Sequence, residues 1–416
     1  MLRDTMYSLL FVGLFVGVSH TVRSEEAPKI PMPSTLLKET AWQSKMHEMS
    51  FAMLALMPDI IPSRGVMSDS EKKNFLENIK HMKSLAHDLK MLSTMKTKRP
   101  DADPSLSFVA SLFQENIARA EKMAEEGNTP YAEHLLRSAT GYCISCHTRA
   151  DGNIQYPHFP LNVSSLDVSD YQKAEMLVAT RQFDRAFDSF IDVTQKESQA
   201  TPPNTLVLEK SVRNALVLAV RVEREKTRVQ RVIDVVLKNK AMPLFLRDEA
   251  KIWEHDLSLL DKQHVWSTLK TATAAQNFEH AKKWIAQAQR EQRYPRDRSK
   301  DVLYLFATAS LHRFLEKNSA PSARKAEALF LLGLCYDVLN ELGAWSLQEM
   351  YYEACIREAP HSQVARACFT RYESFMYGGF SGSMGVHIPN DVQLKIRDLK
   401  KEALPVKELQ HENTLM

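Results

Sequence analysis

Apolar residues recur every three or four positions along four successive stretches in the first third of the chain, which predicts four amphipathic helices. The stretches begin near Thr35, Ser68, Asp103-Pro104 and Thr129-Pro130. Ser68 with Glu71 forms a capping box, and Thr129 is expected to cap the fourth helix. Helices of similar length joined by short connections predict an up-down-up-down bundle over residues 35–160.

From about Val168 the apolar spacing is again helical, with weakly repeated segments. Two of them, 182–190 and 277–285, each place an aromatic residue three positions before a small Ala. A third resembles a tetratricopeptide repeat through Leu332-Gly333, Tyr336, Tyr351-Tyr352, Ala354 and Pro360. These segments predict an α-solenoid over residues 165–376, whose stacked helix pairs leave a concave face for a partner. Residues 377–416 are expected to form a Gly-rich loop and a C-terminal helix or tail.

The composition also favours an all-α chain. Only 12 of 416 residues are Gly, about 3% against a typical ~7%, whereas sheet folds need many Gly-bearing turns. The formal net charge of +3 provides no basic footprint for nucleic acid. Hydrophobic residues make up 44% and charged residues 25%, which is typical of a globular protein of two or three domains.

The N-terminus has the pattern of an export signal. Arg3 precedes an apolar run over residues 7–18, shorter than the ~20 residues that span a bilayer, and Val22-Arg23-Ser24 suits signal peptidase. We therefore expect a signal peptide over residues 1–24, cleaved after Ser24, and an extended leader over 25–34. The mature chain is expected to be periplasmic or otherwise exported, without a membrane span. An uncleaved anchor is the alternative interpretation.

Residues Cys143-Ile144-Ser145-Cys146-His147 form the C-x-x-C-H pattern that attaches a c-type haem. On a helical turn both sulfurs point the same way, so Cys143 and Cys146 can each form a thioether with one porphyrin vinyl group. The adjacent His147 can then ligate the iron. With this composition, about 0.002 such patterns are expected by chance. The sequence therefore predicts one covalent haem c.

Two other chemistries use closely spaced cysteines. A redox dithiol would normally follow a strand in a βαβ pattern, and no strand is predicted before Cys143. A zinc site would need a second Cys or His pair, and the nearby His134 and His158 do not form one. The expected export also favours haem, because haem c is attached outside the cytoplasm, where disulfides would otherwise form.

Three methionines are candidates for a second axial iron ligand. In an up-down-up-down bundle the start of helix 1 lies beside the end of helix 4. Met46, Met49 and Met53 would then project into the core at the end that holds His147. A thioether opposite His is a normal sixth ligand, although methionines at helical spacing also serve as core packing.

These features resemble the class II c-type cytochromes, the cytochrome c-prime type and its low-spin relatives, over residues 34 to about 150. In that family the haem motif lies near the end of helix 4 and the sixth-ligand position early in helix 1. The segment Trp42-Gln43-Ser44-Lys45-Met46 resembles the family pattern in which an Arg-Gln pair precedes the ligand, which implies Met46. Trp42 stands where the family commonly has Arg, so Met49 and Met53 stay open. Family members without the Met ligand are five-coordinate and bind small gases.

Two further features lie in the C-terminal half. Four of the twelve Gly lie between positions 378 and 385, in a loop that could bind a ligand or reach the haem. Met384 or His387 could there compete for iron, and a tight turn between helices is the simpler interpretation. The remaining cysteines permit either one disulfide or buried thiols. They are Cys335, Cys355 and Cys368.

We therefore expect an exported c-type cytochrome that transfers electrons, with the repeat-like half docking a redox partner protein. The alternatives are a five-coordinate haem protein that binds or senses nitric oxide or carbon monoxide, and a partner-binding scaffold with an accessory haem. A haem peroxidase is the weakest alternative because no distal acid/base pair is evident, and no other motif suggests an enzyme. A homo-oligomer is compatible with each of these functions.

Overall fold

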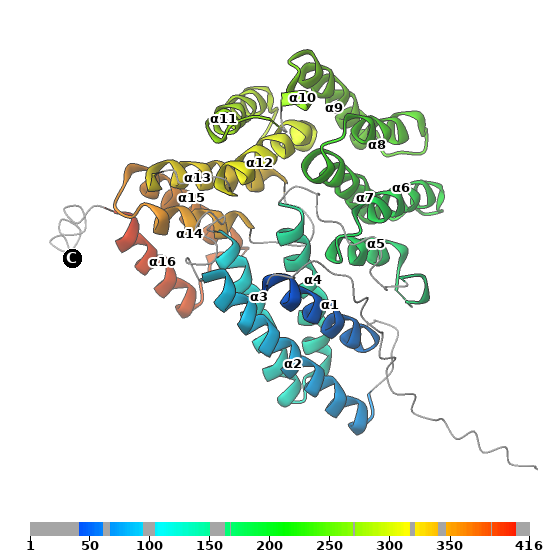
Figure 1. The fold of residues 1–416 in the computed structure, drawn as a ribbon, viewed down its shortest axis with the longest axis vertical. Helices are drawn as coiled ribbons and strands as arrows, with labels where there is room; N and C mark the ends of the chain where they lie inside the picture. The colour runs from blue at the N-terminus through cyan, green and yellow to red at the C-terminus, as the bar shows by residue number, and fades with distance from the viewer. Residues whose placement is uncertain are drawn as a thin grey trace, which may run out of the picture. The chain divides into compact units, whose positions relative to one another are not determined.

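The computed structural model describes residues 41–60, 67–94, 105–149, 163–166, 168–268, 271–316, 321–339, 347–383 and 385–404. Within these ranges the chain forms sixteen α-helices and one two-stranded hairpin, so the all-α expectation is confirmed (Figure 1). No helix in the same ranges has both the length and the apolar character that a membrane span needs. The expected signal peptide and leader lie outside the described residues.

Four helices, called here the N-terminal helices, precede and contain the haem motif. They are α1 (Ala41–Ile60), α2 (Asp69–Thr94), α3 (Ser105–Glu125) and α4 (Thr129–His147). Each packs against the next one, and polar contacts between them fit antiparallel neighbours. These contacts are Lys45–Asp88 between α1 and α2 (3.2 Å), Lys80–Glu125 between α2 and α3 (3.1 Å) and Arg119–Tyr131 between α3 and α4 (3.0 Å). The direction of the chain therefore alternates from α1 to α4.

Local sequence signals position the starts of α2 and α4. The Ser68 hydroxyl accepts the Glu71 N–H (3.3 Å) while the Glu71 carboxylate accepts the Ser68 N–H (2.7 Å), so the predicted capping box forms. The cap of α4 lies one residue earlier than expected. Gly127 turns the chain at φ +82°, and the Asn128 side chain then accepts the Tyr131 N–H (3.3 Å).

The C-terminal helices pack mostly against their neighbours in sequence (Figure 1). They are α5 (Asp170–Ala179), α6 (Phe183–Gln199), α7 (Thr205–Val217), α8 (Lys226–Lys238), α9 (Leu244–Lys262), α10 (Val265–Thr268), α11 (Ala274–Glu291), α12 (Asp301–Glu316), α13 (Ser322–Leu339), α14 (Leu347–Glu358), α15 (Gln363–Gly379) and α16 (Asn390–Ala403). A π-helical turn, η2 (Leu218–Glu223), continues α7, and short 3-10 turns, η1 (Val163–Ser165) and η3 (Arg298–Lys300), precede α5 and α12.

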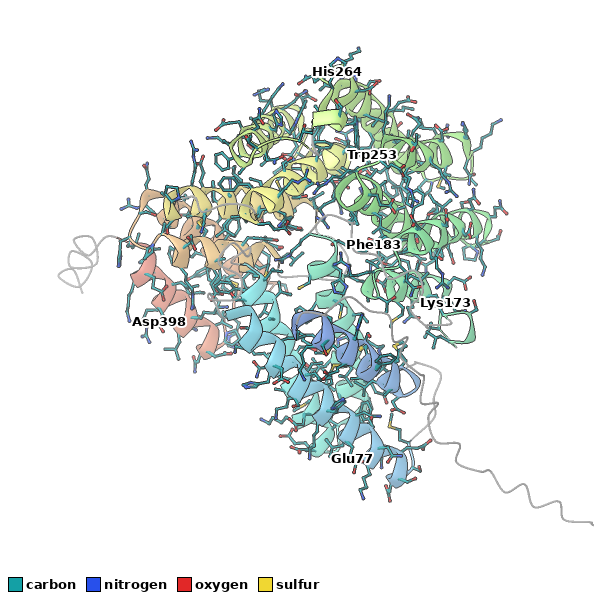
Figure 2. All side chains as sticks on the ribbon, in the orientation of Figure 1. Glu77, Lys173, Phe183, Trp253, His264 and Asp398 are labelled. Carbon is teal, nitrogen blue, oxygen red and sulfur yellow. A yellow bond between two sulfur atoms is a disulfide. The ribbon has the colours of Figure 1, made fainter. Side chains whose placement is uncertain are left out.

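Large apolar side chains fill the space between these helices. Phe183 and Trp253 are fully buried among them, whereas Glu77 and Asp398 are exposed at the surface (Figure 2). The buried apolar residues form one continuous core that includes members of both the N-terminal and the C-terminal helices. Helix α4, which ends in the haem motif, packs against α5.

The α13–α14 pair carries the residues that resemble a tetratricopeptide repeat. Gly333 lies against the ring of Tyr352, and a Cβ at position 333 would come within 2.3 Å of that ring. Tyr352 is fully buried, and its hydroxyl donates to the Asp337 carboxylate. Glycine at position 333 therefore permits the close approach of the two helices.

The structure answers the questions about the remaining cysteines and the Gly-rich segment. Cys355 and Cys368 form a disulfide between α14 and α15, and Cys335 is buried on α13. The Gly-rich segment folds as a small hairpin between α15 and α16, with strands β1 (Ser381–Gly382) and β2 (Gly385–Val386). The side chain of His387 is exposed there, and Met384 lies outside the described residues.

Candidate functional site

The haem motif occupies the last turn of α4, as the sequence predicts. Cys143, Cys146 and His147 stand three and four positions apart, so their side chains lie on one side of the helix. All three residues are half-buried, and neither cysteine takes part in a disulfide. This arrangement leaves two thiols and one imidazole side by side on a single helical turn.

The Cys143 thiol is held in its neutral form. Burial and, to a smaller extent, the nearby Cys146 thiol raise the pKa of this thiol to about 12. A redox-active dithiol needs the opposite, because its attacking cysteine works as a thiolate with a lowered pKa. The environment of Cys143 therefore gives no support to the redox-dithiol alternative.

The His147 imidazole is neutral at neutral pH. Burial and the positive charge of Arg181 lower its pKa to about 3, and a hydrogen bond to the backbone of Ala179 opposes the shift. Its Nδ1 atom is buried and has no hydrogen-bond partner within the described part of the chain. A neutral imidazole with one nitrogen bonded to a carbonyl and the other open is the state in which histidine ligates a metal.

The residues that the structure describes offer no set of zinc ligands. No group of three or more His, Cys, Asp or Glu side chains in the described ranges could hold a metal ion. His134 is exposed, stacks on Tyr131 and lies about 13 Å along α4 from Cys143. His158 lies outside the described residues. A haem iron differs from zinc in needing only one or two protein ligands, so the single imidazole of His147 fits it.

The three candidate methionines lie on α1. Met49 and Met53 are buried, and Met46 is partly buried against the same core. The Arg137 guanidinium of α4 donates to the carbonyl of Ile60 at the end of α1 (2.8 Å), which relates the two helices along their axes. From this contact, His147 lies about 15 Å further along α4.

The two helices run in opposite directions. The residue of α1 that lies about 15 Å from Ile60, towards the start of α1, is Ser50. Met49 is therefore nearly level with His147. Met46 lies about 6 Å beyond that level and Met53 about 5 Å short of it. The axial positions thus bring all three methionines to the end of the N-terminal helices that carries the motif, with Met49 nearest.

A buried polar cluster that the sequence analysis missed follows the motif directly. Arg221, on the π-helical turn η2, donates to the carbonyl and the hydroxyl of Thr148 (2.9 and 3.1 Å) and to the hydroxyl of Tyr336 (2.9 Å). The guanidinium of Arg149 lies 5.2 Å from the centre of the Tyr351 ring. The π-helical turn is the feature that could have drawn attention to Arg221, since such turns often occur at functional sites.

Comparison of the chain with protein-family models, with curated proteins and with solved structures finds no match.

Proposed function

We propose that the chain is an exported c-type cytochrome that transfers electrons through one covalent haem. The observation that carries this proposal is the geometry of the last turn of α4. The neutral thiol of Cys143 and the thiol of Cys146 lie beside the neutral imidazole of His147, whose Nδ1 is buried without a partner among the described residues. The two sulfurs would hold the porphyrin as thioethers, and His147 would ligate its iron.

The bound haem would supply a one-electron carrier. The chain contributes covalent attachment, a fixed neutral imidazole and a largely apolar surrounding core. The alternating directions of α1 to α4 support the bundle expected over residues 35–160 and the resemblance to class II c-type cytochromes.

A methionine of α1 is the sixth ligand in this proposal. The family resemblance implies Met46, whereas the axial position on α1 favours Met49 and places Met53 about 5 Å short of the level of His147. A thioether opposite His147 would raise the reduction potential and leave no open position for a gas. The five-coordinate, gas-binding alternative would require that none of the three side chains reaches the iron.

The disulfide between Cys355 and Cys368 supports export. Structural disulfides persist in oxidising compartments such as the periplasm, where haem c is also attached. The C-terminal helices would dock a redox partner protein. Support for that role comes from the repeat-like packing of Gly333 on Tyr352, because stacked helix pairs present a continuous surface.

The test is the optical spectrum of the haem-loaded full chain and of three variants, Met46→Leu, Met49→Leu and Met53→Leu. Leucine keeps the volume of the side chain and removes the sulfur, so packing changes little. We expect a low-spin spectrum that one of these variants converts to high-spin. Met82→Leu is the control, since Met82 is also a buried methionine but lies on α2. A high-spin spectrum in the unmodified chain would reject the electron-transfer proposal in favour of gas binding.

A further inference from the structure

The two residues that directly follow His147 complete the end of α4. The last carbonyls of a helix have no partner inside the helix, so other groups must bond them. Here the Ile144 carbonyl accepts both the N–H and the hydroxyl of Thr148 (2.9 Å each). The Ser145 carbonyl accepts a bond from Nε of Arg149 (3.0 Å). Because both carbonyls belong to the haem motif, the shape of its turn depends on where Thr148 and Arg149 are held.

Arg221 holds Thr148 from the C-terminal helices. Its Nε donates to the Thr148 carbonyl (2.9 Å), and one terminal nitrogen donates to the Thr148 hydroxyl (3.1 Å). The other terminal nitrogen donates to the hydroxyl of Tyr336 on α13 (2.9 Å). Arg221, Thr148 and Tyr336 are all buried. Since every nitrogen of the planar guanidinium has a partner, the Arg221 side chain is fixed between α4 and α13.

A second series of contacts leads from Tyr336 back to α4. The ring of Tyr336 stacks on the ring of Tyr351, with centroids 5.0 Å apart and planes 12° apart. The guanidinium of Arg149 lies 5.2 Å from the centre of the Tyr351 ring. Thr148 and Arg149 are therefore both attached to one connected buried cluster, which also contains Arg221.

The local backbone suits Arg221 to this position. Arg221 lies within the π-helical turn η2, which continues α7 and ends at Arg224 in the left-handed conformation (φ +55°). A π-turn holds more residues than a turn of α-helix, so its side chains point in directions that an uninterrupted α7 would not give them. Such turns are rare and often occur at functional sites.

We propose that Arg221 is a positioning residue for the iron ligand, which holds Thr148 so that the His147 ring keeps one orientation at the haem. The inference rests on the proposed function, because it needs iron on His147. A planar peptide bond joins His147 to Thr148, so the backbone of the histidine cannot turn unless Thr148 moves with it. Contacts that fix the orientation of a ligating histidine also tune the metal.

Two substitutions loosen the contact at its two ends. Thr148→Val keeps the shape of the side chain and removes the hydroxyl that bonds Arg221, whereas Thr148→Ser keeps that hydroxyl. Arg221→Lys keeps the charge, but a single ammonium cannot reproduce the planar set of donors. Thr194→Val is the matched control, because Thr194 is also a buried threonine and its hydroxyl donates to the carbonyl of Phe190 (2.8 Å) within α6.

The experiment compares the electron paramagnetic resonance spectrum of the oxidised, haem-loaded full chain with the spectra of these variants. The spectrum depends on the orientation of the axial ligands. We expect one signal in the unmodified chain, and a second signal in Thr148→Val and in Arg221→Lys as the ring takes additional orientations. Thr148→Ser and Thr194→Val should keep the single signal. Amide exchange at Thr148 and Arg149 should be on the order of tenfold faster in Arg221→Lys, because bonds to a charged group are lost.

A single unchanged signal in both Thr148→Val and Arg221→Lys would overturn the inference. Faster exchange with an unchanged signal would overturn it too, because Arg221 would then stabilise the helix end without orienting the ligand. A second signal in Thr194→Val would show that any buried substitution has this effect, with the same consequence. If Arg221→Lys failed to fold, Thr148→Val would decide alone. A chain that carries no covalent haem would refute the proposed function instead, and the haem content is measured before the spectra are recorded.

Discussion

Gly333→Ala should destabilise the protein, although alanine is the better helix former. A Cβ at position 333 would lie 2.3, 2.7 and 2.8 Å from three ring carbons of Tyr352, where ordinary contact begins at 3.4 Å. Tyr352 is fully buried and its hydroxyl donates to the Asp337 carboxylate. The ring therefore cannot move aside without disturbing that bond.

The expected magnitude follows from three contributions. Replacing glycine by alanine in a helix favours folding by about 1 kcal/mol. Overpacking of a core costs about 1–3 kcal/mol, and loss of a hydrogen bond to a charged group costs about 1.5–3 kcal/mol. The unfavourable contributions exceed the favourable one, so Gly333→Ala should lower the free energy of unfolding by about 1.5–5 kcal/mol.

Urea denaturation followed by circular dichroism measures this difference. Gly378→Ala is the control, because a Cβ at position 378 would meet no atom within 4 Å, and it should leave stability unchanged or slightly raised. In the Tyr352→Leu background, Gly333→Ala should cost less than in the unmodified chain, since the smaller side chain removes the ring atoms that clash. If Gly333→Ala were as stable as the unmodified chain, the close packing of α13 on α14 would be wrong.

Two further predictions concern the disulfide and the pH dependence of stability. Cys355 and Cys368 are 13 residues apart, so opening their disulfide should lower the free energy of unfolding by about 3 kcal/mol; equal urea midpoints with and without reductant would contradict this. Burial raises the pKa of Glu223 to about 8, although the ion pair with Arg228 opposes the shift. The pKa of this carboxyl is higher in the folded chain than in the unfolded chain, where it has the ordinary value of 4.5. The group therefore contributes its full stabilisation of the fold below pH 4.5, and this contribution is lost as the pH rises through about 8. The free energy of unfolding should therefore fall between about pH 4.5 and 8, and Glu223 should contribute at most about 1.4 kcal/mol per pH unit to this fall. Glu223→Gln should make the fall smaller. If the free energy of unfolding had the same pH dependence in both proteins, Glu223 would be excluded as its source.

The sequence predicted features that depend on residues close together in the chain. The capping box at Ser68 and Glu71 and the helical placement of the haem motif are of this kind, since both follow from spacing within one turn. The sequence predicts a cap at Thr129, whereas Asn128 caps α4, because both residue types favour that position. Only the turn at Gly127 distinguishes them.

Contacts between distant residues could not be predicted in the same way. Arg221 and Thr148 are far apart in the sequence, and a π-helical turn brings the arginine to the end of α4. The approach of Ala179 and Arg181 to His147 depends equally on how α5 packs against α4. Apolar periodicity identifies which face of a helix is buried but not which helix covers that face. The surroundings of His147 could therefore be identified only in the three-dimensional structure.

The central proposal, one covalent haem on Cys143 and Cys146, is tested most directly by a pyridine haemochrome assay. The full chain would be produced in cells that attach haem c, and the mass of the purified protein would be measured alongside. We predict one haem per chain that survives denaturation, and its loss in the Cys143→Ala, Cys146→Ala double variant. A chain without bound haem, or with haem that denaturation releases, would contradict the proposal.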